Sequence, residues 1–124
     1  MFELTVEGEF AAAHRIAGHA GACAQLHGHN YRVVAVVEGE ALDELGMLVD
    51  FAVLRQALAA VTGELDHRCL NEVPALAGAN PTSEQLARHI YQALAKRLQE
   101  EGVIFRVRAV TVQESARSGA TYRE

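Results

Sequence analysis

The chain contains no tryptophan, only two prolines and two cysteines, and aromatic residues make up 6% of its 124 residues. Two cysteines do not form a disulfide framework, which argues against a small secreted domain stabilised by disulfides. No apolar run approaches the roughly 20 residues that a membrane-spanning helix needs. The N-terminus also lacks the basic start and apolar stretch of a secretory signal. We therefore expect a cytoplasmic protein that does not act on a membrane.

A positive charge excess is also absent. The formal net charge is −5 and the isoelectric point is near 5.7, so there is no overall basic field to attract nucleic acid. Half of the residues are apolar and 22% are charged, which is typical of a globular protein. The length predicts one domain, residues 1–124. Because a chain this short buries a smaller fraction of its surface than a large one does, we expect oligomerisation.

Alternating apolar residues predict two strands in the first third of the chain. In residues 2–14 the even positions are mostly apolar and Glu3, Glu7 and Glu9 are odd, which is typical of a half-buried strand ending at His14. A glycine-containing loop is expected over 15–26. Residues 27–40 then predict a second strand, which would bring its histidines close to His14 if the two strands pair antiparallel.

Two helices and two further strands complete the expected order. Asp50 is the expected N-cap of a helix closed by Gly63, with an apolar stripe of Phe51, Leu54, Leu58 and Val61. Thr82 with Gln85 resembles a capping box at the start of a second helix ending near Gly102. Strands are expected over 103–114 and 121–123. The sequence therefore predicts an α+β fold, β-β-α-α-β-β, with two helices on one face of an antiparallel four-stranded sheet.

Three histidines form a candidate metal site. His27 and His29 start the second strand and share one face, because strand side chains alternate with period two. His14 ends the first strand on its apolar side. Three imidazoles are a common way to hold zinc with a fourth position open. A single histidine of this kind would more often be a hydrogen-bonded core or rim residue, but the three together favour a metal site.

Four other residues are candidates for chemistry. Cys23 lies four residues before His27 and has two open roles, as a fourth zinc ligand or as a free thiolate. Asp66 and His67 form an adjacent acid–imidazole pair suited to proton transfer. Adjacent side chains rarely bond to each other on a strand, so we expect both to converge on a third group. Glu114 shares the apolar face of its strand, where it either binds a ring with paired N–H donors or is a solvated strand end.

In its motifs and their order the chain resembles the 6-pyruvoyl-tetrahydropterin synthase family, most closely the bacterial 6-carboxy-tetrahydropterin synthase branch of queuosine biosynthesis. Each motif is modest, but their order and spacing together are specific. The motifs, in chain order, are Phe10-x-Ala12-Ala13-His14, Cys23-x-x-Leu26-His27-Gly28-His29-Asn30-Tyr31, Asp50-Phe51, Leu65-Asp66-His67, Leu70-Asn71, Pro81-Thr82-x-Glu84-x-Leu86-Ala87 and Glu114.

The resemblance implies a tunnelling fold, in which strands of several subunits join into a barrel, and a homohexamer made of two stacked trimers. It also implies residue roles. In this family the three histidines would hold Zn²⁺, Cys23 would be the catalytic base, and Asp66 and His67 would complete a proton relay. Glu114 would anchor the pterin ring, helped by Thr82 and Glu84 of another subunit.

The implied activity is zinc-dependent conversion of 7,8-dihydroneopterin triphosphate to 6-carboxy-tetrahydropterin, with release of acetaldehyde and triphosphate. One alternative is a 6-pyruvoyl-tetrahydropterin synthase, which eliminates triphosphate only. Another is a non-catalytic zinc-binding protein with Cys23 as fourth ligand. In a further branch, which acts as a dihydroneopterin aldolase, the position of Cys23 is typically glutamate, so Cys23 argues against that activity.

Overall fold

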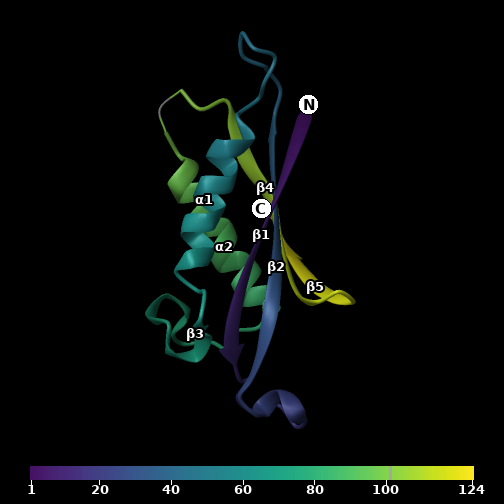
Figure 1. Ribbon diagram of the computed structural model, residues 1–124, viewed down its shortest axis with the longest axis vertical. Helices are drawn as coiled ribbons and strands as arrows, with labels where there is room; N and C mark the ends of the chain where they lie inside the picture. Colours follow the sequence, from purple (N-terminus) through teal and green to yellow (C-terminus); the bar gives the residue numbers. More distant parts are fainter. Residues whose placement is uncertain (101) are drawn as a thin grey trace.

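The computed structural model describes residues 1–100 and 102–124 and forms one sheet covered on one face by two helices (Figure 1). The strand order in the sheet is β3-β1-β2-β4-β5. The expected α+β fold with two helices on one face is therefore confirmed. No helix of the described residues is long and apolar enough to cross a bilayer.

Strands β1 (Phe2–His14) and β2 (His27–Gly39) form the long hairpin predicted from the alternation, and they pair antiparallel along their whole length. The even side chains of β1 and the odd side chains of β2 face the helices. The register places His14 directly opposite His27 and Ala12 opposite His29. All three histidines consequently lie at one end of the hairpin on its helix-facing side.

The helices are α1 (Phe51–Gly63) and α2 (Ser83–Leu98), and each begins at its predicted cap. The Asp50 carboxylate accepts the Ala52 N–H at 2.8 Å, and the Thr82 hydroxyl accepts the Gln85 N–H at 3.2 Å. Both helices bury apolar stripes against the sheet. Phe51 is an exception to the predicted stripe, because it lies at the first turn of α1 and is 47% exposed.

The predicted strand count was wrong, because the sheet has five strands and is mixed rather than purely antiparallel. The additional strand, β3 (Arg68–Cys69), pairs parallel with Ala12 and Ala13 of β1. Two residues are too few to show an alternating pattern, so this strand is specified by its neighbour rather than by its own sequence. The order is thus β-β-α-β-α-β-β, with 3₁₀ turns at Ala22–Ala24, Leu70–Glu72 and Pro74–Leu76.

Two boundaries in the last third of the chain also differ from the prediction. Helix α2 ends at Leu98, before Gly102. Strand β4 (Phe105–Ser115) runs into a tight turn, and β5 (Ser118–Tyr122) starts three residues earlier than expected. The small residues had suggested a longer turn, but they pair with β4 instead. Gly119 packs closely against Gln113, and an added Cβ at Gly119 would lie 2.7 Å from the Gln113 side chain.

The helix-free face of the sheet carries paired charges. Arg32 of β2 bonds to Glu7 of β1 and donates to the Gln113 side-chain oxygen of β4 at 3.0 Å. Glu38, although only 6% exposed, pairs with Arg106 at 2.7 Å and Arg108 at 3.5 Å. These cross-strand ion pairs neutralise charges that would otherwise be costly on a partly buried surface.

Candidate metal centre

The three histidines at the end of the hairpin form one cluster. One ring nitrogen from each of His14, His27 and His29 lies within 4.8 Å of the other two. The His14 ring is 4.6 Å from the His27 ring and 5.2 Å from the His29 ring, measured between centroids. The cluster could therefore hold a metal ion, as the spacing in the sequence predicted.

Backbone carbonyls orient two of the three rings. His14 Nδ1 lies 2.7 Å from the Pro81 carbonyl oxygen, and His27 Nδ1 lies 2.7 Å from that of Gln25. A carbonyl only accepts, so each Nδ1 carries the proton and donates. Each Nε2 is then left with a free lone pair. This arrangement, in which the second ring nitrogen is fixed by a hydrogen bond, is the usual one for metal-binding histidines.

Two ring nitrogens of the cluster lack a hydrogen bond within the described part of the chain. His14 Nε2 and His29 Nε2 are buried without a hydrogen-bond partner among the described residues. Leaving a buried polar atom unpaired is costly, and a metal ion bound at this point would satisfy both. Burial also lowers the pKa of His29. Glu114 opposes that shift, whereas His14 and His27 add to it, so His29 is neutral and able to coordinate at pH 7.

Glu114 lies beside the cluster, on strand β4. Its Oε2 is 3.5 Å from His29 Nε2 and 3.9 Å from His14 Nε2. The side chain is 35% exposed, so the carboxylate borders both the histidines and the solvent. The sequence pointed to Glu114 because it lies on the same apolar strand face as Val110 and Val112. The sequence did not show, however, that the carboxylate approaches the histidines.

Tyr31 is a buried residue of this region to which the sequence analysis assigned no role of its own. It is 0% exposed, its hydroxyl has no hydrogen-bond partner within the described chain, and its ring lies edge-on to His14 and His29. Burial, and secondarily the charge of Glu114, raises the pKa of Tyr31 well above its ordinary value. The signal was available, since Tyr31 follows His29 by two residues and therefore shares its face.

Asp66 and His67 lie on the opposite side of β1, at its outer edge. Asp66 Oδ1 accepts the Ala11 N–H at 2.8 Å, and Asp66 Oδ2 lies 2.9 Å from His67 Nδ1. The expectation that these side chains would not bond to each other was wrong. His67 has a φ of 59°, so the pair is not on a strand and its side chains turn toward each other. The Ala11 N–H, and then His67, lower the pKa of Asp66.

The remaining candidates are not among the clustered metal-ligating atoms. Cys23 lies in the 3₁₀ turn before β2, is partly buried, and its sulfur is not one of the clustered ligand atoms. Thr82 caps α2 next to Pro81, the carbonyl partner of His14. Glu84 is exposed in the first turn of that helix.

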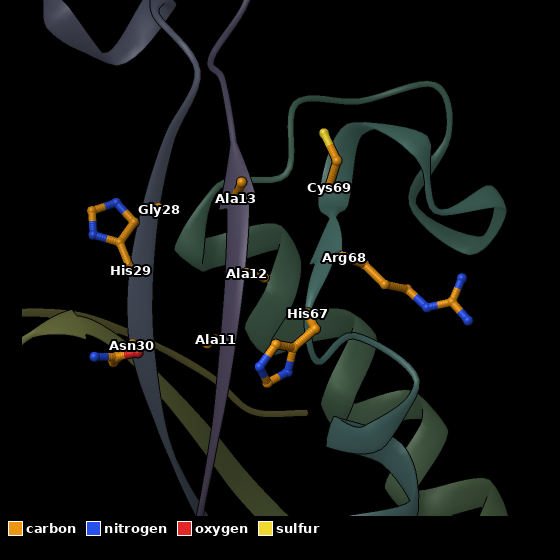
Figure 2. Close-up of a pocket in the computed structure, with 9 residues that line it drawn as sticks. All are labelled: Ala11, Ala12, Ala13, Gly28, His29, Asn30, His67, Arg68 and Cys69. Carbon is orange, nitrogen blue, oxygen red and sulfur yellow. The ribbon is translucent and has the colours of Figure 1, made fainter.

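An open pocket of about 540 Å³ lies between the two groups of candidates, on the end of β1 and β2. Figure 2 shows its floor of Ala11, Ala13 and Gly28, with His29 on one side of β1 and His67 on the other. The small floor residues leave the backbone accessible. Within one chain, His67 consequently faces open space rather than the histidine cluster: its side chain is 81% exposed.

Three comparisons place the chain among known proteins. It is 36% identical to the 6-carboxy-5,6,7,8-tetrahydropterin synthase of Synechocystis, over 98% of this chain and 93% of that one. It is 39% identical to a dihydroneopterin monophosphate aldolase of Pyrococcus furiosus, over 60% of each chain. The fold matches the 6-pyruvoyl tetrahydropterin synthase structure of Caenorhabditis elegans with a TM-score of 0.84 and 28% identity, covering 100% of this chain and 97% of that one.

The family model for 6-pyruvoyl tetrahydropterin synthase matches residues 3–124, nearly the whole chain. The histidine cluster, the two covering helices and all of the hairpin except Phe2 lie inside the matched range. The chain belongs to the 6-pyruvoyl tetrahydropterin synthase family.

Proposed function

We propose that the protein is a zinc-dependent lyase that converts 7,8-dihydroneopterin triphosphate to 6-carboxy-tetrahydropterin, releasing acetaldehyde and triphosphate, for queuosine and related 7-deazapurine biosynthesis. The observation that carries the proposal is the cluster of three histidine nitrogens, two of them buried and unpaired. The near full-length similarity to a protein named for the carboxy product supports this choice of reaction.

The residues of the cluster fit zinc. Their neutral imidazoles are favoured zinc ligands, and three of them leave a coordination position for substrate. When bound, zinc would supply Lewis-acid polarisation of oxygens on the pterin side chain. The chain contributes the orientation of the rings, because the Pro81 and Gln25 carbonyls hold the Nδ1 protons away from the ion.

Glu114 is the proposed anchor of the pterin ring. A carboxylate accepts two parallel N–H bonds from a 2-aminopyrimidinone ring, a charge-assisted contact that fixes the ring in its plane. Since Glu114 lies 3.5 Å from His29, a ring held there would place its side chain beside the histidines. Thr82 and Glu84 are proposed to assist from another subunit.

Cys23, Asp66 and His67 are the proposed proton-transfer groups. Cys23 would act as the base, and the Asp66 carboxylate would hold the His67 ring through the 2.9 Å contact to Nδ1, leaving Nε2 free to exchange a proton. The His67 side chain is 81% exposed and lies away from the cluster of its own chain. We therefore propose that it completes the active site of a neighbouring subunit in a homohexamer.

Product analysis tests the proposed reaction. The zinc-loaded protein is incubated with 7,8-dihydroneopterin triphosphate and the products are identified by mass spectrometry. Carboxy-tetrahydropterin with acetaldehyde is the expected result. A 6-pyruvoyl product would retain the site but change the reaction. In a parallel incubation with dihydroneopterin monophosphate, cleavage would instead favour the activity for which the Pyrococcus relative is named.

The Cys23→Ala variant separates an enzyme from a zinc-binding protein. We expect this variant to keep its zinc, because the Cys23 sulfur is not in the ligand cluster, and to lose at least about 100-fold in turnover, as removal of an acid–base group does. Zinc content is measured by atomic spectroscopy and turnover by product formation. Loss of the metal from Cys23→Ala would instead make Cys23 the fourth ligand of a structural site.

A further inference from the structure

The outer edge of β1 is paired well beyond the two residues that contact β3. At Ala11, the N–H donates to the Asp66 carboxylate and the carbonyl accepts the His67 N–H at 2.6 Å. Strand β3 then pairs with Ala12 and Ala13. In an extended segment the backbone groups that point to one edge belong to alternate residues, so Arg15 and Ala17 present the next groups to the same edge.

Two asparagine side chains satisfy those groups. The Arg15 N–H donates to Asn71 Oδ1 at 2.9 Å, and Asn71 Nδ2 donates to the Arg15 carbonyl at 3.0 Å. Asn80 makes the same pair of bonds with Ala17, both at 2.9 Å. The Oδ1 and one Nδ2–H of a side-chain amide point the same way, so they can bond the C=O and N–H of one residue as the backbone of a neighbouring strand would. Beyond His14, Asn71 and Asn80 therefore make the hydrogen bonds to this edge that the backbone of a neighbouring strand would otherwise make.

The other edge of residues 15–17 bonds to the backbone of Cys23. The Ile16 N–H donates to the Cys23 carbonyl oxygen at 2.7 Å, continuing the side of β1 on which His14 pairs with His27. Ile16 lies between the two residues that the asparagines bind. The segment 15–17 is consequently fixed from both edges, and the turn that carries Cys23 is fixed through it.

We propose that Asn71 and Asn80 are positioning residues that set the place of the Cys23 thiol relative to the histidine cluster. Asn80 also precedes Pro81, whose carbonyl orients His14 at 2.7 Å. Residues 80–81 thus orient the His14 ring and, through Ala17, fix the segment that bonds to the turn carrying Cys23. The consequence for catalysis rests on the proposed function, in which Cys23 is the base. The placement of the thiol by the two asparagines does not depend on that function.

The test measures Cys23 directly by its rate of alkylation with iodoacetamide in the zinc-loaded protein at pH 8, resolved by peptide mass spectrometry. In Asn80→Asp and Asn71→Asp the amide donor becomes a carboxylate facing a carbonyl oxygen. We expect Cys23 to react roughly fivefold to tenfold faster, the change that corresponds to one lost hydrogen bond. Gln92→Glu, the same exchange on the exposed side of α2, should leave the rate unchanged.

The alkylation rate of Cys69 distinguishes a local change around Cys23 from a general loosening of the protein. It is the other free thiol and lies on β3, so Asn80→Asp should leave its alkylation rate unchanged. Asn80→Ala, which loses both bonds without adding a charge, repeats the test if the aspartate variant does not fold. An unchanged Cys23 rate in all three asparagine variants, or an equal rise at Cys69 in the Asn80 variants, would overturn the proposal.

Turnover separates this proposal from the proposed function. With the pterin substrate we expect a several-fold lower kcat and a little-changed KM in the asparagine variants, because the thiol is displaced while Glu114 is not. If the wild-type protein does not turn over the pterin, the proposed function is wrong. The positioning proposal is unaffected, because the alkylation comparison needs no turnover. Faster alkylation of Cys23 with unchanged kcat would leave the placement of the thiol standing and overturn its consequence for catalysis.

Discussion

At the scale of single residues, the candidate site depends on which nitrogen of each histidine is free. The Pro81 and Gln25 carbonyls fix the Nδ1 protons of His14 and His27, so both rings offer Nε2 to the same point. Sequence spacing could predict that the three histidines share a face. It could not predict the carbonyl partners, because Pro81 reaches His14 across 67 residues of chain.

Replacing His14 should remove the metal. His14 is 2% exposed and supplies one of three ligands, so His14→Ala is expected to weaken zinc binding by more than roughly 100-fold, the upper range for loss of a ligand's supporting partner. Competition with a chromophoric chelator measures the affinity. His19→Ala, which changes an exposed histidine in the adjoining loop, is the control. Equal affinity in both variants would show that the cluster does not hold the ion.

Asp66 should contribute to stability only where its carboxylate is charged. Its pKa is lowered from 3.8, first by the Ala11 N–H and then by His67, so its contribution is fully present above that value and is lost as the pH falls through the lowered pKa. Asp66→Asn should therefore be less stable than the wild type at neutral pH, and the difference should shrink as the pH falls below 3.8 through the lowered pKa.

Urea unfolding of the metal-free protein between pH 2.5 and 7 measures this dependence. Glu44→Gln, which neutralises an exposed carboxylate in the connection between β2 and α1, is the matched control and should follow the wild type. A constant difference between Asp66→Asn and the wild type over the whole range would mean that the charge of Asp66 plays no part.

At the scale of elements, the sequence was most informative where a pattern is long. The alternation of β1 and β2 and the stripes of α1 and α2 extend over a dozen or more residues, and their elements were predicted to within a few residues. Strand β3 was missed because its two residues pair only where Ala12 and Ala13 offer an edge. Local patterns do not report such a partner.

The N-cap of α1 provides a stability prediction at this scale. Asp50 Oδ1 accepts the Ala52 N–H at 2.8 Å, so Asp50→Ala should reduce the free energy of unfolding by about 1 kcal/mol. Asp50→Asn keeps a side-chain oxygen at the same place and should cost less than half as much. Chemical denaturation of both variants measures the difference. Equal losses would mean that the capping bond contributes little and that the charge matters instead.

At the scale of the whole molecule, the sheet has two open sides. Strand β1 pairs with β3 only at Ala12 and Ala13, and β5 ends the sheet with five residues. Unpaired strand edges are surfaces on which another chain can continue a sheet. The helix-free face between them carries cross-strand ion pairs.

We predict a homohexamer in solution. Sedimentation equilibrium of the zinc-loaded protein should give six times the 13.4 kDa mass of the chain, because joining open strand edges would let several sheets close into a barrel. A stable monomer that turns over the pterin would contradict the assignment of His67 to a neighbouring subunit.

The placement of all three clustered histidines in one hairpin has a consequence for the order of events during synthesis. His14 and His29 are separated by only 15 residues of chain, and their strands pair directly with each other. Contacts between residues close in sequence form early, because little chain entropy is lost in closing the loop. The groups that later orient and border them, Pro81 and Glu114, are translated afterwards. A nascent chain can thus present its complete set of metal ligands well before the helices exist to cover them.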